Sequence, residues 1–519
     1  MHSMKTNRGT EGLLGTFYVG PKVGLTKFAA AAATIRSAMT VAVLSALLLI
    51  AARPAQATQE VLYNFTSNPD GANPGSSLIS YNGNFYGTTY SGGLGYGTVF
   101  ELSPNGSGGW VETVLYEFCS QLSCTDGENP TYAYLTVDGS GNLYGTTFGG
   151  GANGYGAVFE LTSSGESWTE TVLYSFANSP DGANPVNGLI MDTAGHLYGT
   201  TWAGGTNGNG TVFEMTLSGG TWTEAVISNI SSTYAGLTMH GGNIYGIGYT
   251  TVFQLSPNGK GGWIREVIHN FIAADAAKQG SDPNGTPVFD SAGNLYGTTE
   301  TGGTYGYGVV YKLTPGAAGK PWAAKLLASL GKGSAYPLAG VVFDSAGNLY
   351  GTATQGGAKG LGCVFELVAP AGGVGAYKEK VIWNFDGENG NTPDAGLFVD
   401  TAGNLYGTTY LGGSSGYGSV FVVNPAAAVT TTTMTSSLNP SISGQSVTFT
   451  ATVTSSAGAP PDGEVVVFEP LGQSTLSGGV ATWTTSTLAV GKTNVRAVYE
   501  GDLDFITSMS AWLPQIVKQ

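Results

Sequence analysis

Charged residues are scarce in this sequence: Lys, Arg, Asp and Glu make up only 10% of its 519 residues. Aromatic residues reach 11%, and this combination excludes an intrinsically disordered chain, which is rich in charge and poor in aromatics. Basic residues are especially few, because 19 Lys and Arg stand against 34 Asp and Glu, for a formal net charge of −15. Binding of nucleic acid needs clustered basic residues that neutralise phosphates. We therefore expect no nucleic acid partner.

Cysteine is also rare. The 3 Cys include no C-x-x-C pair, which argues against a cysteine zinc site. Cys119 and Cys124 lie close together in a loop-like stretch, and they are a candidate disulfide for an oxidising compartment. The sequence contains no H-E-x-x-H, G-x-S-x-G or nucleotide-binding motif. We therefore expect no resident cofactor or metal and a non-catalytic protein.

Long apolar runs are absent except near the N-terminus. Residues 1–57 combine a basic leader, an apolar run at 38–52 and the A-x-A sequence Ala55-Gln56-Ala57, which together predict a secretory signal peptide. The apolar run is short for a membrane span, which needs about 20 apolar residues; the alternative is an uncleaved N-terminal anchor. No comparable run follows. We expect a mature chain that starts at Thr58, has no membrane span and is secreted or held in the cell envelope.

Glycine is abundant, with 83 residues, but it follows no three-residue period, which excludes collagen. The glycines belong instead to a larger repeat. GNFYG at 83–87 returns six more times in close variants, the last at 403–407, with a mean spacing of about 53 residues. This period is typical of a four-stranded propeller blade. The repeated tyrosines are Tyr86, Tyr144, Tyr198, Tyr245, Tyr296, Tyr350 and Tyr406.

The phase of the repeats predicts how they are arranged. Each unit contains four short strand-like runs separated by Gly and Asn turns. The mature chain opens with a run of the fourth type, VLYNF at 61–65, and the repeat region closes with a run of the third type, GSVFVV at 418–423. Pairing these two runs removes an exposed sheet edge. We predict an all-β protein in which 58–425 form a seven-bladed β-propeller closed by its N-terminal strand.

The repeat resembles the Gly-rich tandem repeat described for Gloeobacter and Verrucomicrobia, called the GloVer repeat. The resemblance rests on the seven GN[LFI]YG segments, the G-x-G-[TAS]-V-F-E-L strands and the VLYxF strands, and it covers about 60–423. It implies an exported protein and supplies no established catalytic residues. The fourth unit departs from the pattern, because GNIYGIGYTTVF lacks the Gly-Gly loop.

The composition changes after the repeats. Residues 426–438 are rich in Thr and Ser and predict a linker, and 439–519 contain strand-like runs at regular spacing. This last segment resembles a bacterial Ig-like domain, by SVTFTATV, PDGEVVVFE, GGVATWTTSTLAVG and AVYEGD. A β-sandwich without a disulfide is expected, and such domains serve as spacers, stalks or binders.

Two sets of repeated residues are candidates for ligand binding. Aromatic residues follow the second strand in five units. They predict a circle of aromatic side chains that stack on sugars or bind peptide side chains. The alternative is that these aromatic side chains pack against the Gly loops. These residues are Tyr90, Phe148, Trp202, Tyr249 and Tyr410. The second set lies in D-G-x-N loops, where turn formation explains the acids better than Ca²⁺ does. Its members are Asp70, Asp126 and Asp181.

Three functions are compatible with this sequence. The first is an exported, non-catalytic repeat protein whose propeller face binds an extracellular glycan or protein, carried beside an Ig-like spacer. The second is a secreted polysaccharide lyase or hydrolase on a propeller scaffold. The third is a purely structural surface protein. No motif identifies the ligand or the oligomeric state.

Overall fold

The computed structural model is almost entirely β-structure. It describes residues 56–130, 132–165, 167–317, 320–370, 375–455, 457–458, 460 and 462–519. The predicted signal peptide therefore lies outside the described residues, apart from its last two positions. Helix in the described part is limited to single turns at η1 (Leu122–Cys124), η2 (Ala273–Asp275) and α2 (Ala276–Gln279). None of these has the length and apolar character that a membrane crossing requires.

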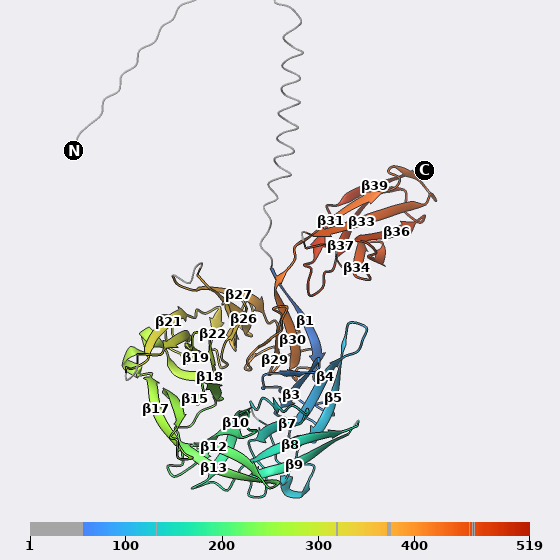
Figure 1. Cartoon of the computed structure of the whole chain (residues 1–519). Coiled ribbons are helices and arrows are strands. Elements are labelled where there is room, and N and C mark those ends of the chain that lie inside the picture. The colour runs from blue at the N-terminus through green and yellow to red at the C-terminus, as the bar shows by residue number, and fades with distance from the viewer. Residues whose placement is uncertain are drawn as a thin grey trace, which may run out of the picture. The chain divides into compact units, whose positions relative to one another are not determined.

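Seven four-stranded antiparallel sheets account for the repeat region (Figure 1). The first three contain β2 (Ile79–Tyr81), β3 (Asn84–Thr89), β4 (Thr98–Pro104) and β5 (Trp110–Glu117); β6 (Thr136–Val137), β7 (Leu143–Thr147), β8 (Ala157–Ser164) and β9 (Ser167–Ser175); and β10 (Gly182–Met191), β11 (Leu197–Gly204), β12 (Thr211–Ser218) and β13 (Thr221–Asn229). The fourth and fifth contain β14 (Thr238–His240), β15 (Asn243–Ile247), β16 (Thr251–Pro257) and β17 (Trp263–Asn270); and β18 (Ser281–Phe289), β19 (Leu295–Thr301), β20 (Val309–Thr314) and β21 (Ala323–Ser329). The sixth contains β23 (Val342–Phe343), β24 (Leu349–Ala353), β26 (Cys363–Val368) and β27 (Lys378–Asn384). A small extra pair joins β22 (Ser334–Ala335) to β25 (Gln355–Gly356).

The seventh sheet combines the two ends of the repeat region. Its order is β1 (Gln56–Asn64), β30 (Ser419–Ala427), β29 (Leu405–Thr409) and β28 (Phe398–Val399). Val61 pairs with Phe421 and Asn64 with Ser419 in an antiparallel register. The strand pairing expected between 61–65 and 418–423 is therefore present, and the N-terminal strand supplies the fourth strand that the last unit lacks.

The core of the repeat region is divided among the contacts between neighbouring sheets. Each sheet shares one buried apolar cluster with the sheet that follows it in the chain. The seventh and first sheets share a cluster of the same kind, in which Val420 packs with Phe65, Phe85 and Phe100. The sheets are therefore connected in a closed sequence of contacts, and the architecture is all-β and propeller-like.

The repeated GNLYG segment has a steric explanation. A Cβ atom on Gly199 in β11 would lie only 2.4 Å from Cζ of Phe213 in β12. Phe213 is fully buried, so its ring has no room to retreat. The equivalent glycine and aromatic ring meet in the other six units, and a larger side chain at this position would overpack the core.

Aspartates before the second strand of five units act as turn residues. In the third unit, Asp192 Oδ1 accepts hydrogen bonds of 2.9 Å from the backbone N–H groups of Ala194 and His196. The imidazole of His196 contacts the other carboxylate oxygen at 3.1 Å. His196 therefore has a structural role, and the turn holds the entry of β11.

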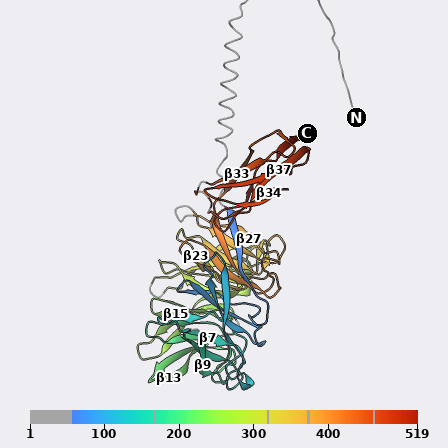
Figure 2. The ribbon, with the colours of Figure 1, turned by 90° about the vertical axis from the view of Figure 1, so that its right-hand side faces the viewer.

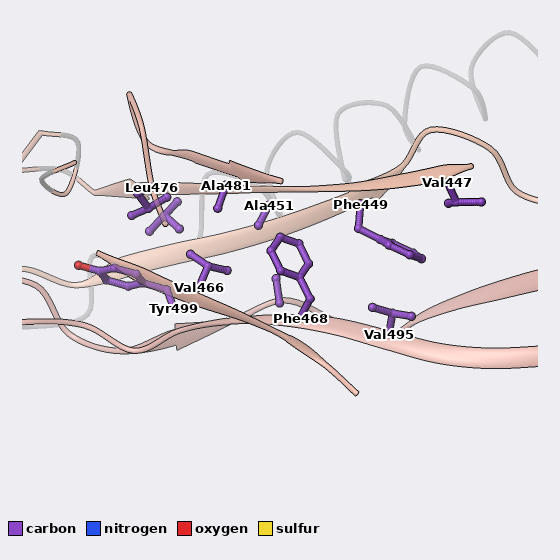
Figure 3. Close-up of a cluster of buried hydrophobic side chains, with 11 residues drawn as sticks. Val447, Phe449, Ala451, Val466, Phe468, Leu476, Ala481, Val495 and Tyr499 are labelled. Carbon is purple, nitrogen blue, oxygen red and sulfur yellow. The ribbon is translucent and has the colours of Figure 1, made fainter. Parts of the chain in front are cut away.

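The C-terminal part contains two further sheets. One has the order β31 (Thr430–Ser436), β33 (Val447–Ser455) and β36 (Val480–Thr485); the other contains β32 (Ser441–Ile442), β39 (Leu513–Lys518), β37 (Gly491–Tyr499), β34 (Val465–Glu469) and β35 (Gly472–Thr475), with β38 (Ser508–Met509) beside β37. Figure 2 labels β33, β34 and β37 of this part. Side chains of both sheets, including Phe449 and Phe468, point toward one another in a single buried cluster (Figure 3). β31 starts inside the segment predicted as a linker.

Candidate functional site

The seven repeats surround one central cavity of about 550 Å³. Its wall is formed mainly by the segments that lead into the innermost strand of each sheet, and every repeat unit contributes at least one lining residue. These segments carry short side chains next to the inner strand, such as Ser77, Gly340 and Gly396. The volume lies within the range of small-molecule binding sites.

One repeat position gives this cavity its chemical character. It lies three residues before the apolar residue or proline that opens the inner strand, which in the first unit is Leu78. Six of the seven residues at this position line the cavity, and they differ in size, polarity and charge. In chain order the seven residues are Gly75, Tyr132, Val186, Tyr234, Asn284, Leu338 and Asp394.

Aromatic rings gather around Tyr132 and Tyr234, which both line the cavity. Their ring centroids are 6.1 Å apart, and Trp202 lies 6.4 Å from Tyr234. Tyr90 and Tyr410 form a second pair at 6.5 Å. The two groups meet over Gly75, where an added Cβ would lie 3.5 Å from the rings of both Tyr132 and Tyr410. We call these five rings the aromatic cluster: Tyr90, Tyr132, Trp202, Tyr234 and Tyr410.

The aromatic cluster contains three of the five residues predicted for ligand binding. Trp202 and Tyr90 are each 38% exposed, so their ring faces remain accessible. The other two predicted residues, Phe148 and Tyr249, make no ring contact with the cluster among the described residues. Tyr249 is 64% exposed and belongs to the unit that lacks the Gly-Gly loop. The sequence prediction missed Tyr132 and Tyr234, although their repeat position is visible in the sequence once the units are aligned on the inner strand.

Asparagines of the D-G-x-N loops hold the backbone beneath these rings. The side chain of Asn73 donates a 3.0 Å hydrogen bond to the carbonyl of Tyr410 in the preceding sheet, and Asn184 donates at 2.9 Å to Phe148. Asn129 donates in the same way to Tyr90 at 3.0 Å. Asn73 has a positive φ of 59°, which asparagine tolerates better than most residues. The loops after the second and fourth strands therefore share one face, and adjacent units brace each other there.

Tyr134 closes part of the cavity. Its hydroxyl donates to the carbonyl of Leu237 at 3.5 Å, so the side chain reaches from the second unit to the fourth. An added Cβ on Gly236 would meet the Tyr134 hydroxyl at 2.9 Å, together with Asn187 and Thr286. Burial raises the pKa of Tyr134 to about 12. The hydroxyl therefore stays protonated at neutral pH and acts as a fixed donor.

Acidic groups are the charged residues of the cavity wall. Asp394 is only 8% exposed, and its Oδ1 atom is buried with no hydrogen-bond partner among the described residues. Burial raises the pKa of Asp394 to about 7. Glu300 also lines the cavity, and burial together with Asp282 raises its pKa. The described lining residues include no Lys, Arg or His.

The aspartates considered as weak calcium candidates are engaged within their own turns. Asp70 accepts hydrogen bonds from the hydroxyls of Tyr63 at 2.7 Å and Thr66 at 2.8 Å. Asp126 and Asp181 likewise accept from a tyrosine hydroxyl and a backbone N–H of the preceding segment. These contacts are those of a turn, the interpretation that the sequence favoured. Calcium binding by these three aspartates stays the weaker alternative.

A glutamate of the following sheet lies beside each of these three aspartates. Burial, with a smaller contribution from Asp126, raises the pKa of Glu170 to about 7. The same two causes, with Asp181 as the neighbour, raise the pKa of Glu224 to about 7. Burial and Asp70 raise the pKa of Glu112 to about 8, while a hydrogen bond from Tyr63 opposes them. Each glutamate has one buried carboxylate oxygen with no partner among the described residues, and burial therefore favours the protonated form of each glutamate.

Cys119 and Cys124 form a disulfide, as the sequence predicted, and Cys363 is buried and free. Among the described residues, the one group of three potential ligands close enough to share a metal ion comprises this cystine and Glu128. The sulfur atoms of a disulfide are not thiolates, and the thiolate is the form of cysteine that binds metal.

Comparison with protein families assigns most of the chain. Residues 95–250 and 232–459 match the Gloeobacter/Verrucomicrobia repeat. Residues 434–518 match the bacterial Ig-like domain of group 3. A comparison with curated proteins returns no match.

Solved structures provide distant likenesses. The extracellular domain of a putative hybrid two component system from B. thetaiotaomicron has 12% identity and a TM-score of 0.46, and the aligned region covers 90% of this chain and 59% of that domain. PorZ, a surface component of the type-IX secretion system of Porphyromonas gingivalis, has 13% identity and a TM-score of 0.41, with coverage of 88% and 61%. A polysaccharide lyase, an ulvan lyase bound to a glucuronate–rhamnose sulfate ligand, has 14% identity and a TM-score of 0.42, with coverage of 69% and 95%. This chain therefore spans less than two thirds of the length of the first two structures.

Proposed function

The chain belongs to the Gloeobacter/Verrucomicrobia repeat family, and on this premise we propose that it is an exported, non-catalytic protein that binds an extracellular glycan. In this proposal the repeats form a seven-bladed β-propeller closed by β1, and the C-terminal sheets form an Ig-like sandwich that carries it. Seven four-stranded sheets and a closed sequence of shared core clusters support the blade count. The facing sheets around Phe449 and Phe468 support the sandwich.

The observation that carries the proposal is the aromatic cluster beside the central cavity. Pyranose rings present apolar faces that stack on aromatic side chains and hydroxyls that need hydrogen-bond partners. Trp202 and Tyr90 offer partly exposed rings, and Asn187, Thr286 and Asp394 offer polar groups inside the cavity. Exposed aromatics next to convergent polar groups are typical of a binding site.

A panel of labelled oligosaccharides, titrated against the mature chain, tests this proposal. Trp202→Ala should weaken binding of the glycan that binds best by at least about threefold, because stacking contributes about 0.5–1.5 kcal/mol beyond the buried area. Its melting temperature should stay close to that of the parent, since the ring is 38% exposed.

Trp168→Ala is the matched control. Trp168 lies on the outer strand β9 and packs against the cluster between the first two sheets, 6.5 Å from Tyr86. Its loss should lower the melting temperature and spare the affinity. If Trp202→Ala destabilises the protein and no oligosaccharide binds the parent, the aromatic cluster is core packing, and the structural function predicted as an alternative replaces glycan binding.

A polysaccharide-active enzyme is the second candidate, because Asp394 and Glu300 both line the cavity and paired carboxyl groups carry out glycoside hydrolysis. The distinguishing measurement is product release from the glycan that binds. Shorter products would favour the lyase or hydrolase, whereas binding without products supports the non-catalytic function. Export is tested separately by N-terminal sequencing of the protein recovered outside the inner membrane, which should begin at Thr58.

A further inference from the structure

Asp394 is an unusual residue for a cavity wall. The residue is 8% exposed, and its Oδ1 atom has no hydrogen-bond partner among the described residues. A buried carboxylate without a partner is costly, so such groups normally pair with a cation or accept several hydrogen bonds. In the other six units the residue at the equivalent position is uncharged, as Gly75 and Leu338 are. The seventh unit therefore carries a charged group that the fold itself does not use.

The surroundings of Asp394 favour a cation. The other titratable groups of the cavity wall are Glu300 and the hydroxyls of Tyr132, Tyr134 and Tyr234. Burial and then the carboxylate of Asp394 raise the pKa of Tyr132; burial, Tyr90 and Asp394 raise the pKa of Tyr410. Two acids and several aromatic faces, with no basic residue among the described lining residues, complement a positive charge through ion pairing and cation–π contact.

The kind of cation follows from the neighbours. A calcium ion takes six to eight oxygen ligands, whereas the groups nearest Asp394 include aromatic rings. An organic ammonium needs one strong acceptor and tolerates aromatic faces. The cavity of about 550 Å³ has room for a small-molecule group, and the adjacent rings of Trp202 and Tyr90 suit a sugar.

We infer that the central cavity binds a glycan bearing a free amino group, an oligosaccharide of 2-amino-2-deoxyhexose units, with its ammonium paired to Asp394. The inference rests on the proposed glycan-binding function and specifies its ligand. The ammonium would pair with the carboxyl group of Asp394, which lines the cavity, and the sugar rings would extend toward Trp202.

The test compares two hexasaccharides on the full mature chain by titration calorimetry: a glucosamine hexamer and an N-acetylglucosamine hexamer. Acetylation removes the charge and keeps the ring. We expect the amino hexamer to bind at least about tenfold more tightly, the scale of one charged hydrogen bond. Asp394→Asn should remove this preference, because it keeps the shape and loses the charge, while the acetylated hexamer should change by less than about twofold.

Asp386→Asn is the matched control, since Asp386 belongs to the same repeat unit and pairs with Lys359 at 3.4 Å on the exposed surface. It removes the same formal charge and should leave the preference unchanged. A hexamer of lysine is the third probe. If the lysine peptide binds tightly and Trp202→Ala does not weaken its binding, the proposed sugar ligand is wrong and the site is assigned to a basic peptide.

Two outcomes separate this inference from the function on which it rests. If both hexamers bind with equal affinity and Trp202→Ala weakens both, the proposed pairing of an ammonium group with Asp394 is wrong, whereas glycan binding is supported. Failure of the parent to bind either hexamer would overturn the inference, and the wider oligosaccharide panel would then decide the proposed function. Thermal melting of Asp394→Asn establishes that the variant is folded, and we expect it to be at least as stable as the parent because a buried unpaired charge is lost.

Discussion

Partly buried glutamates on the outer strands should make the protein less stable as the pH rises from 5 to 8. Glu170 illustrates the reason. Its pKa is raised from 4.5 to about 7 in the folded state, so between these values the folded protein holds a proton that the unfolded chain releases. Stability falls with pH wherever the folded state binds more protons. The contribution of Glu170 is therefore full below its unfolded pKa and is lost as the pH passes about 7.

The magnitude follows from the shift. Moving a carboxyl pKa from 4.5 to about 7 corresponds to roughly 3 kcal/mol of free energy of unfolding. Glu170 is only partly buried, and solvent screening reduces the effect; we expect about 1–2 kcal/mol for this residue. Glu112, Glu224 and Asp394, whose pKa values are raised to about 8, 7 and 7, act in the same direction. The parent should thus lose several kcal/mol between pH 5 and pH 8.

The variant Glu170→Gln isolates the contribution of one glutamate to the pH dependence of stability. The amide keeps the shape of the protonated acid and offers a donor to Asp126, whose Oδ1 atom is buried without a partner. Urea unfolding at pH 5, 6, 7 and 8 should show equal stability at pH 5 and a gain of about 1–2 kcal/mol at pH 8. Glu266→Gln, on the exposed part of β17, should leave the curve unchanged. A pH profile of Glu170→Gln that is parallel to the parent, or a loss of stability at pH 8, would refute the proton assigned to Glu170.

Three further predictions concern the repeat framework. Deletion of 58–66 removes β1 and the fully buried Phe65, and it should lower the melting temperature sharply, since loss of a buried Phe alone costs about 3–5 kcal/mol; an unchanged melting curve would show that β1 is a tail. Gly199→Ala should cost about 1–3 kcal/mol in urea unfolding because its Cβ would lie 2.4 Å from the ring of Phe213, whereas an alanine at exposed Gly139, where φ is not positive and a Cβ meets nothing within 4 Å, tests the effect of replacing glycine without a steric clash. Replacing both Cys119 and Cys124 by serine should cost no more than about 2 kcal/mol, because the loop that the disulfide closes is short.

The fold was largely predictable because its information is local and repeated. The GNLYG glycine is required by contact with the next strand, so it recurs wherever that contact recurs. The aspartate turns were also predictable, since the side chain of Asp192 bonds to backbone groups two and four residues away. Even the pairing of 61–65 with 418–423 followed from the order of strand types. The bounds were less accurate: the outer strand begins at Trp110, earlier than the VLYEF run, because cross-strand pairing extends it.

The candidate site was only partly predictable, because its contacts join units far apart in the sequence. The rings of Tyr132 and Tyr234 meet at 6.1 Å although a whole repeat lies between them. Asp394 carried no motif, and nothing in its neighbouring residues indicated burial. The proximity of two glutamates to Asp126 and Asp181 was not predictable for the same reason, because each glutamate is distant in the sequence from its aspartate. Periodicity within one unit does not show which residues of different units converge.

Sequence differences among the repeats still indicate which positions of different units come together in the structure. Seven copies of one unit share the same steric requirements, so a position that serves only the fold should tend to keep one type of residue, as the GNLYG glycine does. The position that precedes the inner strand by three residues instead runs from Gly75 through Tyr132 to Asp394. Because six of the seven units place this position at the wall of the central cavity, the fold needs only that these side chains together fit the space around it. Selection for a ligand can then act on each unit separately. A variable inward-facing position of this kind is therefore one at which a single-copy function, such as a lone buried carboxylate, can be placed without disturbing the repeat.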